Sequence, residues 1–378
     1  MKFWDTTLKE FNKKVLIIPN WTYFGEDKDI NSDSFLLVMK SFLERTPDNI
    51  KYIIPYPKDN FPNSLAAFPN VELVDMGHLS SFPPLMRTQF PSNVFRNIFG
   101  NYEIDVIWSH LPEWTNQVLI ARRYNVMTQP VYGYCHWWEL KENGAYKWNS
   151  FVENINGILQ MKECGVNSEW VKRLIIQRAG ETFNQSVLDK LEEIIKPWYL
   201  GCDDYKEYGD KNDIPTIVFN HRDNGYTGFD IFFGIMDELW DKGYKFKVLT
   251  TTMEIDKAYT ECVKNPDREI YLQNISKAHI GVGAFQKYSA WSMSVTDGLS
   301  IGVPYLLPKG LCYEEMIGDS NPLLYTDKNQ LKYWLEAFVS GKTNFSSINT
   351  NELTNKLSWK NTLFGWSILD ELGIKPIF

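Results

Sequence analysis

The residues best suited to chemistry follow short apolar runs, where a strand of an α/β domain would end. The run TIVFN, residues 216–220, is followed by His221 and Arg222. An arginine at a strand end can place two parallel N–H groups on a diphosphate, which a lysine cannot do. The alternative is that Arg222 pairs with a nearby carboxylate such as Asp223. The spacing indicates an anion-binding arginine, with Asn220 beside it.

A second stretch, GAFQKYSAWSMSVTDGLSIGVP (residues 283–304), reads as a loop, a helix and a buried strand. We expect Ser289 to cap the helix, Asp297 to lie in its second half, Gly302 to end it and the strand to open at Val303. A loop that feeds a helix N-terminus presents backbone N–H groups and the positive end of the helix dipole to an anion. The segment therefore predicts a site for the diphosphate of a nucleotide sugar.

The stretch YGYCHWWEL ends a strand candidate at His136. A histidine there can accept the proton of an acceptor hydroxyl or hydrogen-bond the transferred sugar, because its pKa lies near neutrality. Glu139 could orient it or act as the base itself. Trp137 and Trp138 could stack on a sugar or a base. For all of these aromatic-rich positions the alternative is core packing. His110, in WSHLPEW, is a second histidine at a strand end.

The elements that must position these residues alternate between strand and helix in two successive series. The first series has strand candidates KVLIIPN, KYIIPYP, VELVDM, EIDVIWSH, PVYGYCHWW, GILQM and WYLGCD. After a polar stretch, the second has TIVFN, YKFKVLTT, REIYLQN, AHIGVGA and PLLYT. Helical spacing of apolar residues separates most of them, as in SFLLVMKSFLERT and TGFDIFFGIMDELWDKG. Such alternation predicts parallel sheets with helices on both faces.

We therefore expect an α/β protein with two Rossmann-like doubly wound domains that face each other across a cleft. Residues 1–203 would form an acceptor-binding domain and residues 204–214 a linker. Residues 215–360 would form a nucleotide-sugar-binding domain, and a C-terminal helix over 361–378 would pack back toward the first domain. Ligands of such sheets bind beyond the carboxyl ends of the strands.

Composition narrows the functional class. The chain has 378 residues, a net charge of −8 and 15% aromatic residues, so a protein that coats nucleic acid non-specifically is disfavoured. The five cysteines are scattered and never form a CxxC pair, which signals neither a disulfide framework nor a zinc site. No signal-peptide pattern opens the sequence, and no apolar run reaches the ~20 residues of a membrane span. We expect a cytoplasmic protein, in the host cytoplasm if it is phage-encoded.

Two motifs resemble those of family 4 glycosyltransferases. Arg222, followed five positions later by Thr227, Gly228 and Phe229, resembles the R-x4-K-G-F segment that opens the second domain of that family. The segment 283–304 resembles the family's E-x7-E segment ending in GVP, with Ser289 at the first acidic position and Asp297 at the second. FNHR and PKGLCYEEM are also similar to queuosine-tRNA mannosyltransferases, and IPNWTYF to phage enzymes that glycosylate hydroxymethylated DNA bases.

The resemblance implies a metal-independent GT-B glycosyltransferase with a nucleotide-sugar co-substrate, a UDP-sugar, and no other cofactor. It implies that Arg222 binds the diphosphate and Asp297 the ribose. Thr227 stands in place of a phosphate-binding lysine, and Ser289 in place of a glutamate beside the sugar. Lys309 or Lys287 could compensate for the missing lysine, although nothing in the sequence places either of them. The full set of donor-binding candidates is Asn220, Arg222, Thr227, Gly228, Tyr288, Ser289, Ala290, Trp291, Asp297 and Lys309.

The favoured acceptor, by resemblance, is a 5-hydroxymethylated pyrimidine in phage DNA. Acceptor-binding candidates are His110, Trp137, Trp138 and Arg87. Basic residues of the first domain could contact phosphates, with scattered surface charge as the alternative: Arg87, Arg96, Arg122, Arg123, Lys172, Arg173 and Arg178. Other possibilities are a glycosyltransferase acting on tRNA, a polysaccharide or a small molecule, or a non-catalytic nucleotide-sugar-binding protein. We expect no membrane association and no stable protein partner.

Overall fold

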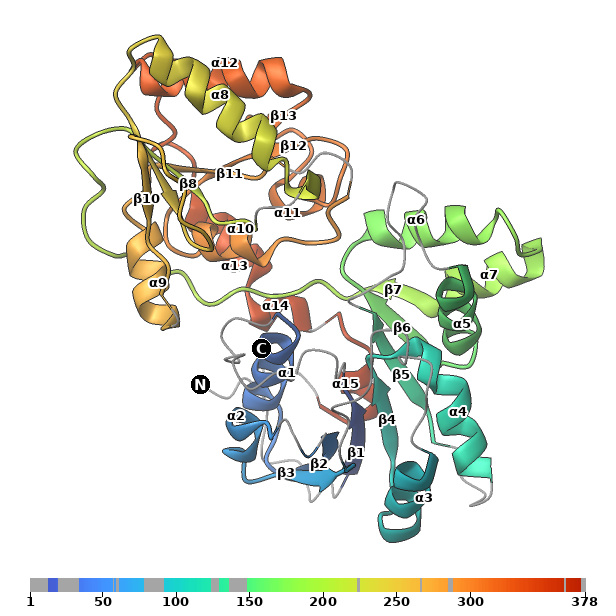
Figure 1. The fold of residues 1–378 in the computed structure, drawn as a ribbon. Helices are drawn as coiled ribbons and strands as arrows, with labels where there is room; N and C mark the ends of the chain where they lie inside the picture. Colours follow the sequence, from blue (N-terminus) through green and yellow to red (C-terminus); the bar gives the residue numbers. More distant parts are fainter. Residues whose placement is uncertain are drawn as a thin grey trace. The chain divides into compact units, whose positions relative to one another are not determined.

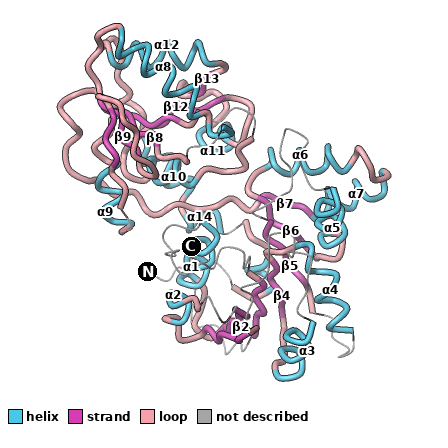
Figure 2. The backbone as a smooth tube through the Cα atoms, viewed as in Figure 1, coloured by secondary structure: helices cyan, strands magenta, loops and turns pink. Residues whose placement is uncertain are grey.

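The structure is a computed structural model of residues 1–378. It describes residues 13–19, 34–56, 58, 61–77, 92–123, 129–135, 148–222, 225–265, 267–284, 288–363 and 365–374. At 34–37, 92–93, 121–123, 148–150 and 226 it describes the backbone alone. The chain divides into two compact units, shown in Figures 1 and 2. Unit 1 comprises Met1–Tyr199 and Leu363–Phe378, and unit 2 comprises Leu200–Thr362.

Unit 1 contains a seven-stranded parallel sheet in the order β3-β2-β1-β4-β5-β6-β7. Central strands β1 and β4 are almost entirely buried, as expected for a sheet covered on both faces. The strands are β1 (Lys13–Ile18), β2 (Ile50–Tyr56), β3 (Val71–Asp75), β4 (Val106–Ser109), β5 (Val131–Cys135), β6 (Glu163–Val166) and β7 (Ile195–Pro197).

The helices of unit 1 cover both faces of this sheet. Figure 1 shows α3, α4 and α5 on one side and α1 on the other. Helices α4 and α5 pack closely because Gly157 of α5 lies against α4, where a Cβ would come within 1.7 Å of the Pro112 carbonyl oxygen. The helices are α1 (Ser34–Arg45), α2 (Asn63–Ala66), α3 (Ser92–Asn101), α4 (Pro112–Arg123), α5 (Trp148–Ile158), α6 (Glu169–Ala179) and α7 (Gln185–Ile194).

The C-terminal segment from Leu363 onward belongs to unit 1. The structure has two short helices near this end of the chain, α14 (Trp359–Leu363), which lies in unit 2 up to Thr362, and α15 (Ile368–Glu371) in unit 1, rather than one helix over 361–378. Between them the buried Trp366 stacks on Trp198 at a centroid distance of 5.2 Å and on Tyr134 at 5.5 Å. Such stacking of large aromatic rings adds to the free energy gained by burying their surface.

Unit 2 contains a six-stranded parallel sheet in the order β10-β9-β8-β11-β12-β13. Figure 1 shows α8 and α12 on one side of it and α9, α10 and α13 on the other. The strands are β8 (Thr216–Phe219), β9 (Lys247–Thr250), β10 (Thr260–Cys262), β11 (Ile280–Val282), β12 (Tyr305–Pro308) and β13 (Leu324–Tyr325). The helices are the 3-10 turn η3 (Gly225–Thr227), α8 (Phe229–Asp241), α9 (Arg268–Ile275), α10 (Met293–Leu299), α11 (Tyr313–Ile317), α12 (Lys328–Val339) and α13 (Thr350–Leu357).

The segment 204–214, for which the sequence predicts a linker, lies within unit 2 and is hydrogen-bonded to it. The Lys206 amide donates to the Ser300 carbonyl oxygen at 2.8 Å. The Lys211 ammonium donates to the carbonyl oxygens of Ser276 and Gly302, at 2.9 and 3.2 Å. These carbonyls follow the ends of α9 and α10, where a cation interacts favourably with the helix dipole. Burial lowers the Lys211 pKa to about 8.

The sequence predicts strands for three short apolar runs, and the structure shows that each of these predictions is wrong. GILQM (157–161) covers the end of α5 and a turn, and the strand starts later, at Glu163. WYLGCD (198–203) follows β7 and contributes only an isolated bridge at Cys202. REIYLQN (268–274) is the helix α9, capped by the side chain of Asp267. Periodicity cannot distinguish a short buried strand from a short helix, so local capping and tertiary contacts decide.

Candidate functional site

The order of the strands in unit 2 marks one place on its sheet. The chain runs outward from β8 through β9 to β10, and then returns to the other side of β8 with β11, β12 and β13. The order therefore reverses between β8 and β11. In open parallel sheets the ligand binds outside the carboxyl ends of the strands at such a reversal. Residues 220–222 follow β8 and residues 283–284 follow β11, so these two loops define the candidate donor site.

Asn220 joins the elements around this site. Its side-chain amide donates to Tyr271 Oη of α9 at 3.0 Å and to the Ser294 carbonyl oxygen of α10 at 2.9 Å. Its side-chain oxygen accepts from Tyr305 Oη of β12 at 3.0 Å. The side chain is buried, and these bonds use both amide hydrogens. Asn220 therefore fixes the strand end against α9, α10 and β12 rather than presenting its amide to a ligand.

His221 and Arg222 lie in opposite environments. His221 is buried, and its Nε2 lies 3.2 Å from the Val282 carbonyl oxygen, so Nε2 carries the proton because a carbonyl only accepts. Burial lowers the His221 pKa to about 4, which keeps the ring neutral at physiological pH. Arg222 is exposed, and no described carboxylate pairs with it; Asp223, the partner in the alternative interpretation, lies outside the described residues. Within the described residues, its guanidinium is the cation at the reversal point that no acid neutralises.

The loop after Arg222 is held close to the end of β11. Gly228 has a left-handed backbone (φ 71°), and a Cβ there would lie 1.7 Å from the Ala284 carbonyl oxygen. The Thr227 hydroxyl donates to the Arg222 carbonyl oxygen at 2.8 Å and is buried. Thr227 therefore shapes the loop that carries Arg222, and its side chain holds no positive charge for a phosphate.

The segment 283–304 differs in detail from the sequence prediction. Its helix α10 is capped by Ser292, whose side chain accepts from the Val295 amide, and not by Ser289. The helix spans seven residues, and Asp297 lies in its second half as predicted. The buried strand opens at Tyr305 rather than at Val303.

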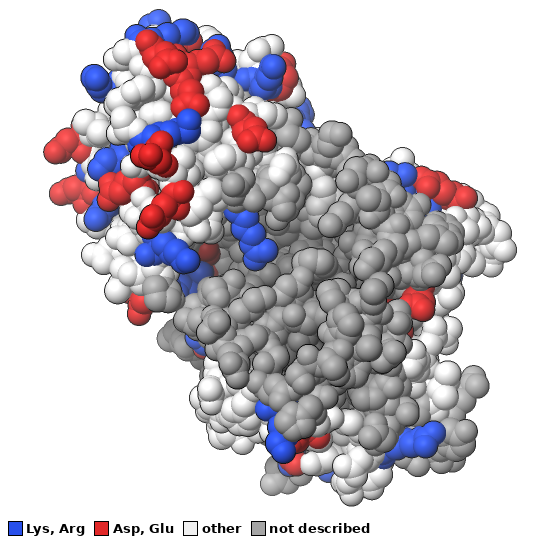
Figure 3. All heavy atoms as spheres, viewed as in Figure 1, with Lys and Arg blue, Asp and Glu red and all other residues white. Residues whose placement is uncertain are grey.

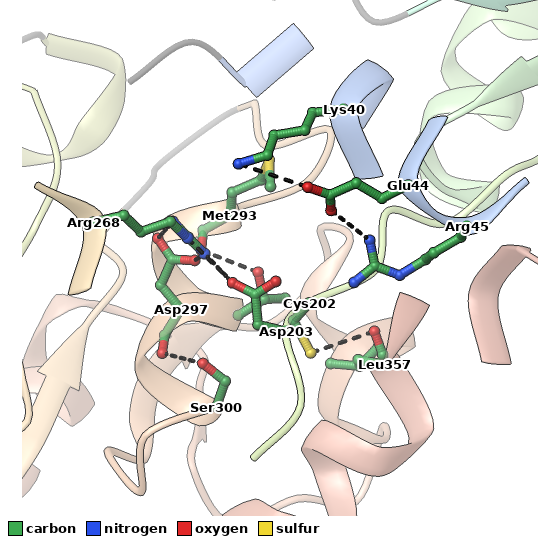
Figure 4. Close-up of polar contacts among 11 residues, drawn as sticks. Lys40, Glu44, Arg45, Cys202, Asp203, Arg268, Met293, Asp297, Ser300 and Leu357 are labelled. Atoms are coloured by element: carbon green, nitrogen blue, oxygen red, sulfur yellow. Dashed lines mark hydrogen bonds and ion pairs between the residues drawn. The ribbon is translucent and has the colours of Figure 1, made fainter. Parts of the chain in front are cut away.

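Asp297 is buried and bound by an arginine that the sequence did not single out. Arg268 Nη2 donates to Asp297 Oδ1 at 2.7 Å, and Nη1 donates to Oδ2 at 3.4 Å. The same guanidinium donates to Asp203 Oδ2, from Nη2 at 2.8 Å and from Nε at 3.1 Å. Figure 4 shows Arg268 between the two carboxylates. One arginine thus faces two acids, which leaves a net negative charge at Asp203 and Asp297.

The electrostatics of this group follow from burial. Desolvation raises the Asp297 pKa, while Arg268 and a hydrogen bond with Tyr271 act against that rise. Burial alone would lower the Arg268 pKa, but the two carboxylates raise it overall. The Tyr271 hydroxyl also accepts from Asn220. A chain of polar contacts therefore runs from the end of β8 to the Asp297 carboxylate.

Ser289 lies in an uncharged buried cluster. Its hydroxyl donates to Tyr313 Oη at 3.0 Å, and Cys312 Sγ lies 3.6 Å from the Ser289 oxygen. Burial raises the pKa of both the Cys312 thiol and the Tyr313 hydroxyl, so each is neutral near pH 7. The position at which the resemblance has a glutamate therefore contributes a packed hydroxyl with no charge.

The remaining donor candidates lie in the loops around the same edge. Lys309 directly follows β12, and its side chain is exposed. Tyr288, Ala290 and Trp291 are half-buried in the loop that precedes α10. The structure thus brings the donor candidates of the sequence to one edge of the unit 2 sheet. Their ligand contacts stay a prediction.

In unit 1 the strand order reverses between β1 and β4. His110 directly follows β4, so it lies at this reversal, buried against the rings of Trp108 at 4.5 Å and Tyr134 at 5.6 Å. The position of His110 fits the predicted acceptor site, whereas its packing among aromatic rings fits the alternative that it is a core residue. The other acceptor and base candidates lie outside the described residues: His136, Trp137, Trp138, Glu139 and Arg87.

The described basic residues of unit 1 form no single-sign surface. Lys172 pairs with Glu192 at 2.9 Å and Arg178 with Glu181 at 2.6 Å, whereas Arg173 is exposed. On the face drawn in Figure 3, the described acidic and basic side chains are intermixed. On this one face, the described residues therefore form no surface of a single positive sign.

No protein-family model and no curated protein matches this chain. Solved structures do. Sucrose-phosphate synthase of Thermosynechococcus elongatus superposes with a TM-score of 0.70 at 13% identity, over 95% of this chain and 98% of that one. Anabaena HepE in complex with UDP superposes with a TM-score of 0.66 at 12% identity, over 96% of this chain and 99% of that one. The lipopolysaccharide outer core galactosyltransferase WaaB superposes with a TM-score of 0.63 at 11% identity, over 94% of this chain and 98% of that one. The chain has the GT-B fold.

Within this GT-B chain, the sequence alone did not reveal the residues whose side chains hold the candidate site residues in place. They act through contacts between elements far apart in the sequence, so no local pattern marks them. The aromatic and polar residues concerned are Asp203, Arg268, Tyr271, Tyr305 and Tyr313.

The described residues of this GT-B chain contain no group of three or more His, Cys, Asp or Glu side chains that could hold a metal ion. None of the described helices is long and apolar enough to cross a membrane. The cysteines are all free thiols, and Cys262 is the one that is not buried.

Proposed function

We propose that this chain is a glycosyltransferase that moves a sugar from a UDP-sugar donor to a hydroxyl group. The observation that carries the proposal is the exposed Arg222, which has no carboxylate partner among the described residues and lies where the strand order of unit 2 reverses. A guanidinium there can bind a diphosphate with two hydrogen bonds. HepE, which has the same fold, has been solved with UDP and with UDP-glucose.

The donor would lie along the carboxyl edge of the unit 2 sheet. Arg222 would bind the diphosphate. The close approach of Gly228 to Ala284 would bring the backbone of the loop after Arg222 near the same diphosphate. Asp297 would accept hydrogen bonds from the ribose hydroxyls, since a carboxylate has two oxygens with spare lone pairs. Lys309, exposed after β12, would add a second positive charge.

In the transfer, the bond between the anomeric carbon and the diphosphate oxygen breaks, and the acceptor oxygen bonds to that carbon. Negative charge develops on the departing diphosphate, so Arg222 would stabilise the transition state more than the ground state. The acceptor proton passes to a base, for which His136 or Glu139 is the proposal. Together, the donor and the acceptor supply every atom of the products, and no redox partner is needed.

For the acceptor we propose the hydroxyl of a 5-hydroxymethylated pyrimidine in DNA. This choice rests on the sequence resemblance to phage enzymes, and the charges of both signs on the face drawn in Figure 3 do not add to it. A base inside a duplex must leave the stack before its substituent can reach an active site. The contacts to the extruded base would fall to the candidates of unit 1.

The test combines labelled donor with nucleoside mass spectrometry. The purified full chain is incubated with labelled UDP-glucose, or another UDP-sugar, and DNA containing 5-hydroxymethylcytosine or 5-hydroxymethyluracil. We expect a nucleoside heavier by one sugar residue and release of UDP. If the DNA nucleosides stay unmodified with every donor while sugar is transferred to tRNA or to a small alcohol, the proposed DNA acceptor is wrong but the proposed glycosyl transfer stands. UDP-sugar binding without transfer to any acceptor would instead indicate a binding protein.

A further inference from the structure

We infer that Arg268, held by Asp203, is a positioning residue that orients the Asp297 carboxylate toward the ribose hydroxyls of the donor. The inference rests on the proposed function, because the ribose belongs to the proposed UDP-sugar. Neither a motif nor the resemblance points to Arg268 or Asp203. Their role follows from the geometry of the three side chains shown in Figure 4.

The first argument is the division of the guanidinium between two acids. Its Nη1 and Nη2 face the two oxygens of Asp297, while Nε and Nη2 face a single oxygen of Asp203. A planar guanidinium with bonds on two edges cannot rotate without breaking one set of them. Asp203 therefore fixes the plane of Arg268, and Arg268 in turn fixes the plane of the Asp297 carboxylate.

The second argument is how firmly Asp203 itself is anchored. It follows Cys202, whose amide donates to the Leu357 carbonyl oxygen at 2.9 Å and whose carbonyl accepts from the Trp359 amide at 3.2 Å. Cys202 thus forms a parallel bridge with Ser358. The start of unit 2 is therefore tied to the chain around α13, which also packs on α10, the helix that carries Asp297.

The third argument concerns the charges that face Asp297. From α9 come Arg268 and Tyr271, and from the start of unit 2 come Cys202 and Asp203. Tyr305 of β12 is neutral, because burial raises its pKa. The buried side chains of helix α13 are uncharged: Thr350, Thr354 and Leu357. Its charged side chains, Glu352 and Lys356, are exposed.

Arg268 is thus the only described cation in contact with this buried carboxylate. Burial favours protonation of Asp297, and a protonated carboxyl would lose acceptor capacity for ribose hydroxyls. Replacing a buried ion pair with apolar residues often leaves a fold equally stable, so its presence at a proposed ligand site calls for a role in binding. Holding Asp297 ionised and oriented is such a role.

The test compares the affinities of UDP and 2′-deoxy-UDP for the full chain by calorimetry. Loss of one ribose hydroxyl should weaken binding to the wild type roughly tenfold, as expected for a hydrogen bond to a charged group. In Arg268→Gln we expect this ratio to fall toward one. In Arg268→Lys, which keeps the charge but not the fork, and in Asp203→Asn, we expect intermediate ratios.

The pH profile gives a second readout that a merely structural role would not change. Without Arg268 the Asp297 pKa rises, so UDP affinity should begin to fall at a higher pH than in the wild type. Lys206→Gln is the matched control, because Lys206 pairs with Glu269 and so joins the same two segments without touching Asp297. Circular dichroism checks that each variant is folded.

The outcomes separate the two proposals. A wild type that binds neither UDP nor a UDP-sugar would overturn the proposed function, and this inference with it. A wild type that binds UDP, together with an Arg268→Gln variant that keeps the wild-type UDP to deoxy-UDP ratio and pH profile, would overturn this inference alone. If Arg268→Gln is not folded, the ratios of Arg268→Lys and Asp203→Asn decide: both unchanged would overturn it.

Discussion

Tyr305 Oη donates a 3.0 Å hydrogen bond to the side-chain oxygen of Asn220, deep in unit 2. The bond joins β12 to the end of β8, across the intervening strand β11. Both residues are buried, and Asn220 uses its amide hydrogens on α9 and α10. The end of β8, which carries Arg222, is therefore placed by a hydrogen-bond network rather than by the loop alone.

Tyr305→Phe should test this network. The ring stays, but the Asn220 oxygen loses its donor inside the core, which should lower the free energy of unfolding by about 1–3 kcal/mol. We expect weaker UDP binding as well, because the network places the strand end. Chemical denaturation and calorimetry measure the two effects. Tyr333→Phe, at an exposed tyrosine of α12, is the control and should change neither. A Tyr305→Phe variant with wild-type stability would contradict the network's importance.

Arg222→Ala should reduce UDP affinity about 10- to 100-fold, the range expected for losing charge-assisted hydrogen bonds. Stability should be unchanged, since the side chain is exposed and pairs with no described acid. Arg222→Lys should recover part of the affinity, because it keeps the charge but not the two-pronged geometry. Binding is measured by calorimetry.

The control for Arg222 is Lys342→Ala. Lys342 is an exposed cation of the same unit, and it lies with Pro215 and His279 at the opposite, amino-terminal edge of the sheet. Its removal should leave UDP affinity unchanged. Equal losses of affinity in both variants would mean that general surface charge, rather than a defined site, attracts the nucleotide.

Gly228→Ala should disrupt the loop that carries Arg222. The backbone at Gly228 is left-handed, and the new Cβ would meet the Ala284 carbonyl oxygen at 1.7 Å. We expect a loss of stability of about 1–3 kcal/mol and weaker UDP binding. Gly243→Ala, also left-handed but in open space after α8, should lose stability without losing affinity. Equal affinity losses in both would contradict the close approach as the cause.

His221 should make stability depend on pH in the acid range. Its pKa is about 4 in the folded protein and near 6.5 when unfolded, so the unfolded chain binds the extra proton between these values. Stability should therefore fall as the pH drops from about 6.5 to about 4, by roughly 3 kcal/mol at most. Urea denaturation across this range should show a shallower fall for His221→Gln.

The half-buried His279 offers a comparison for that experiment. Burial also lowers its pKa, and its Nδ1 accepts from the Thr216 amide at 3.2 Å. Because it is less buried than His221, His279→Gln should flatten the acid fall less. A His221→Gln profile as steep as that of the wild type would show that other groups govern the acid range.

The sequence by itself determined the fold class and the location of Arg222. Alternating apolar runs and helical patterns predicted two doubly wound units, because a buried parallel strand must be apolar throughout and a covering helix on one face only. The polar residues after TIVFN marked a strand end. Local pattern failed for REIYLQN, whose helix depends on a cap at Asp267 and on burial of Leu272 and Ile275.

Tertiary structure decided which of the polar residues at that edge remain available to a ligand. The sequence placed Asp297 in its helix, but only the fold shows that Arg268, 29 residues earlier, binds its carboxylate. Likewise Thr227 and Ser289 turn inward to partners at Arg222 and Tyr313. These pairings join segments that chain topology brings together, and the strength of a buried polar contact depends on that environment rather than on sequence spacing.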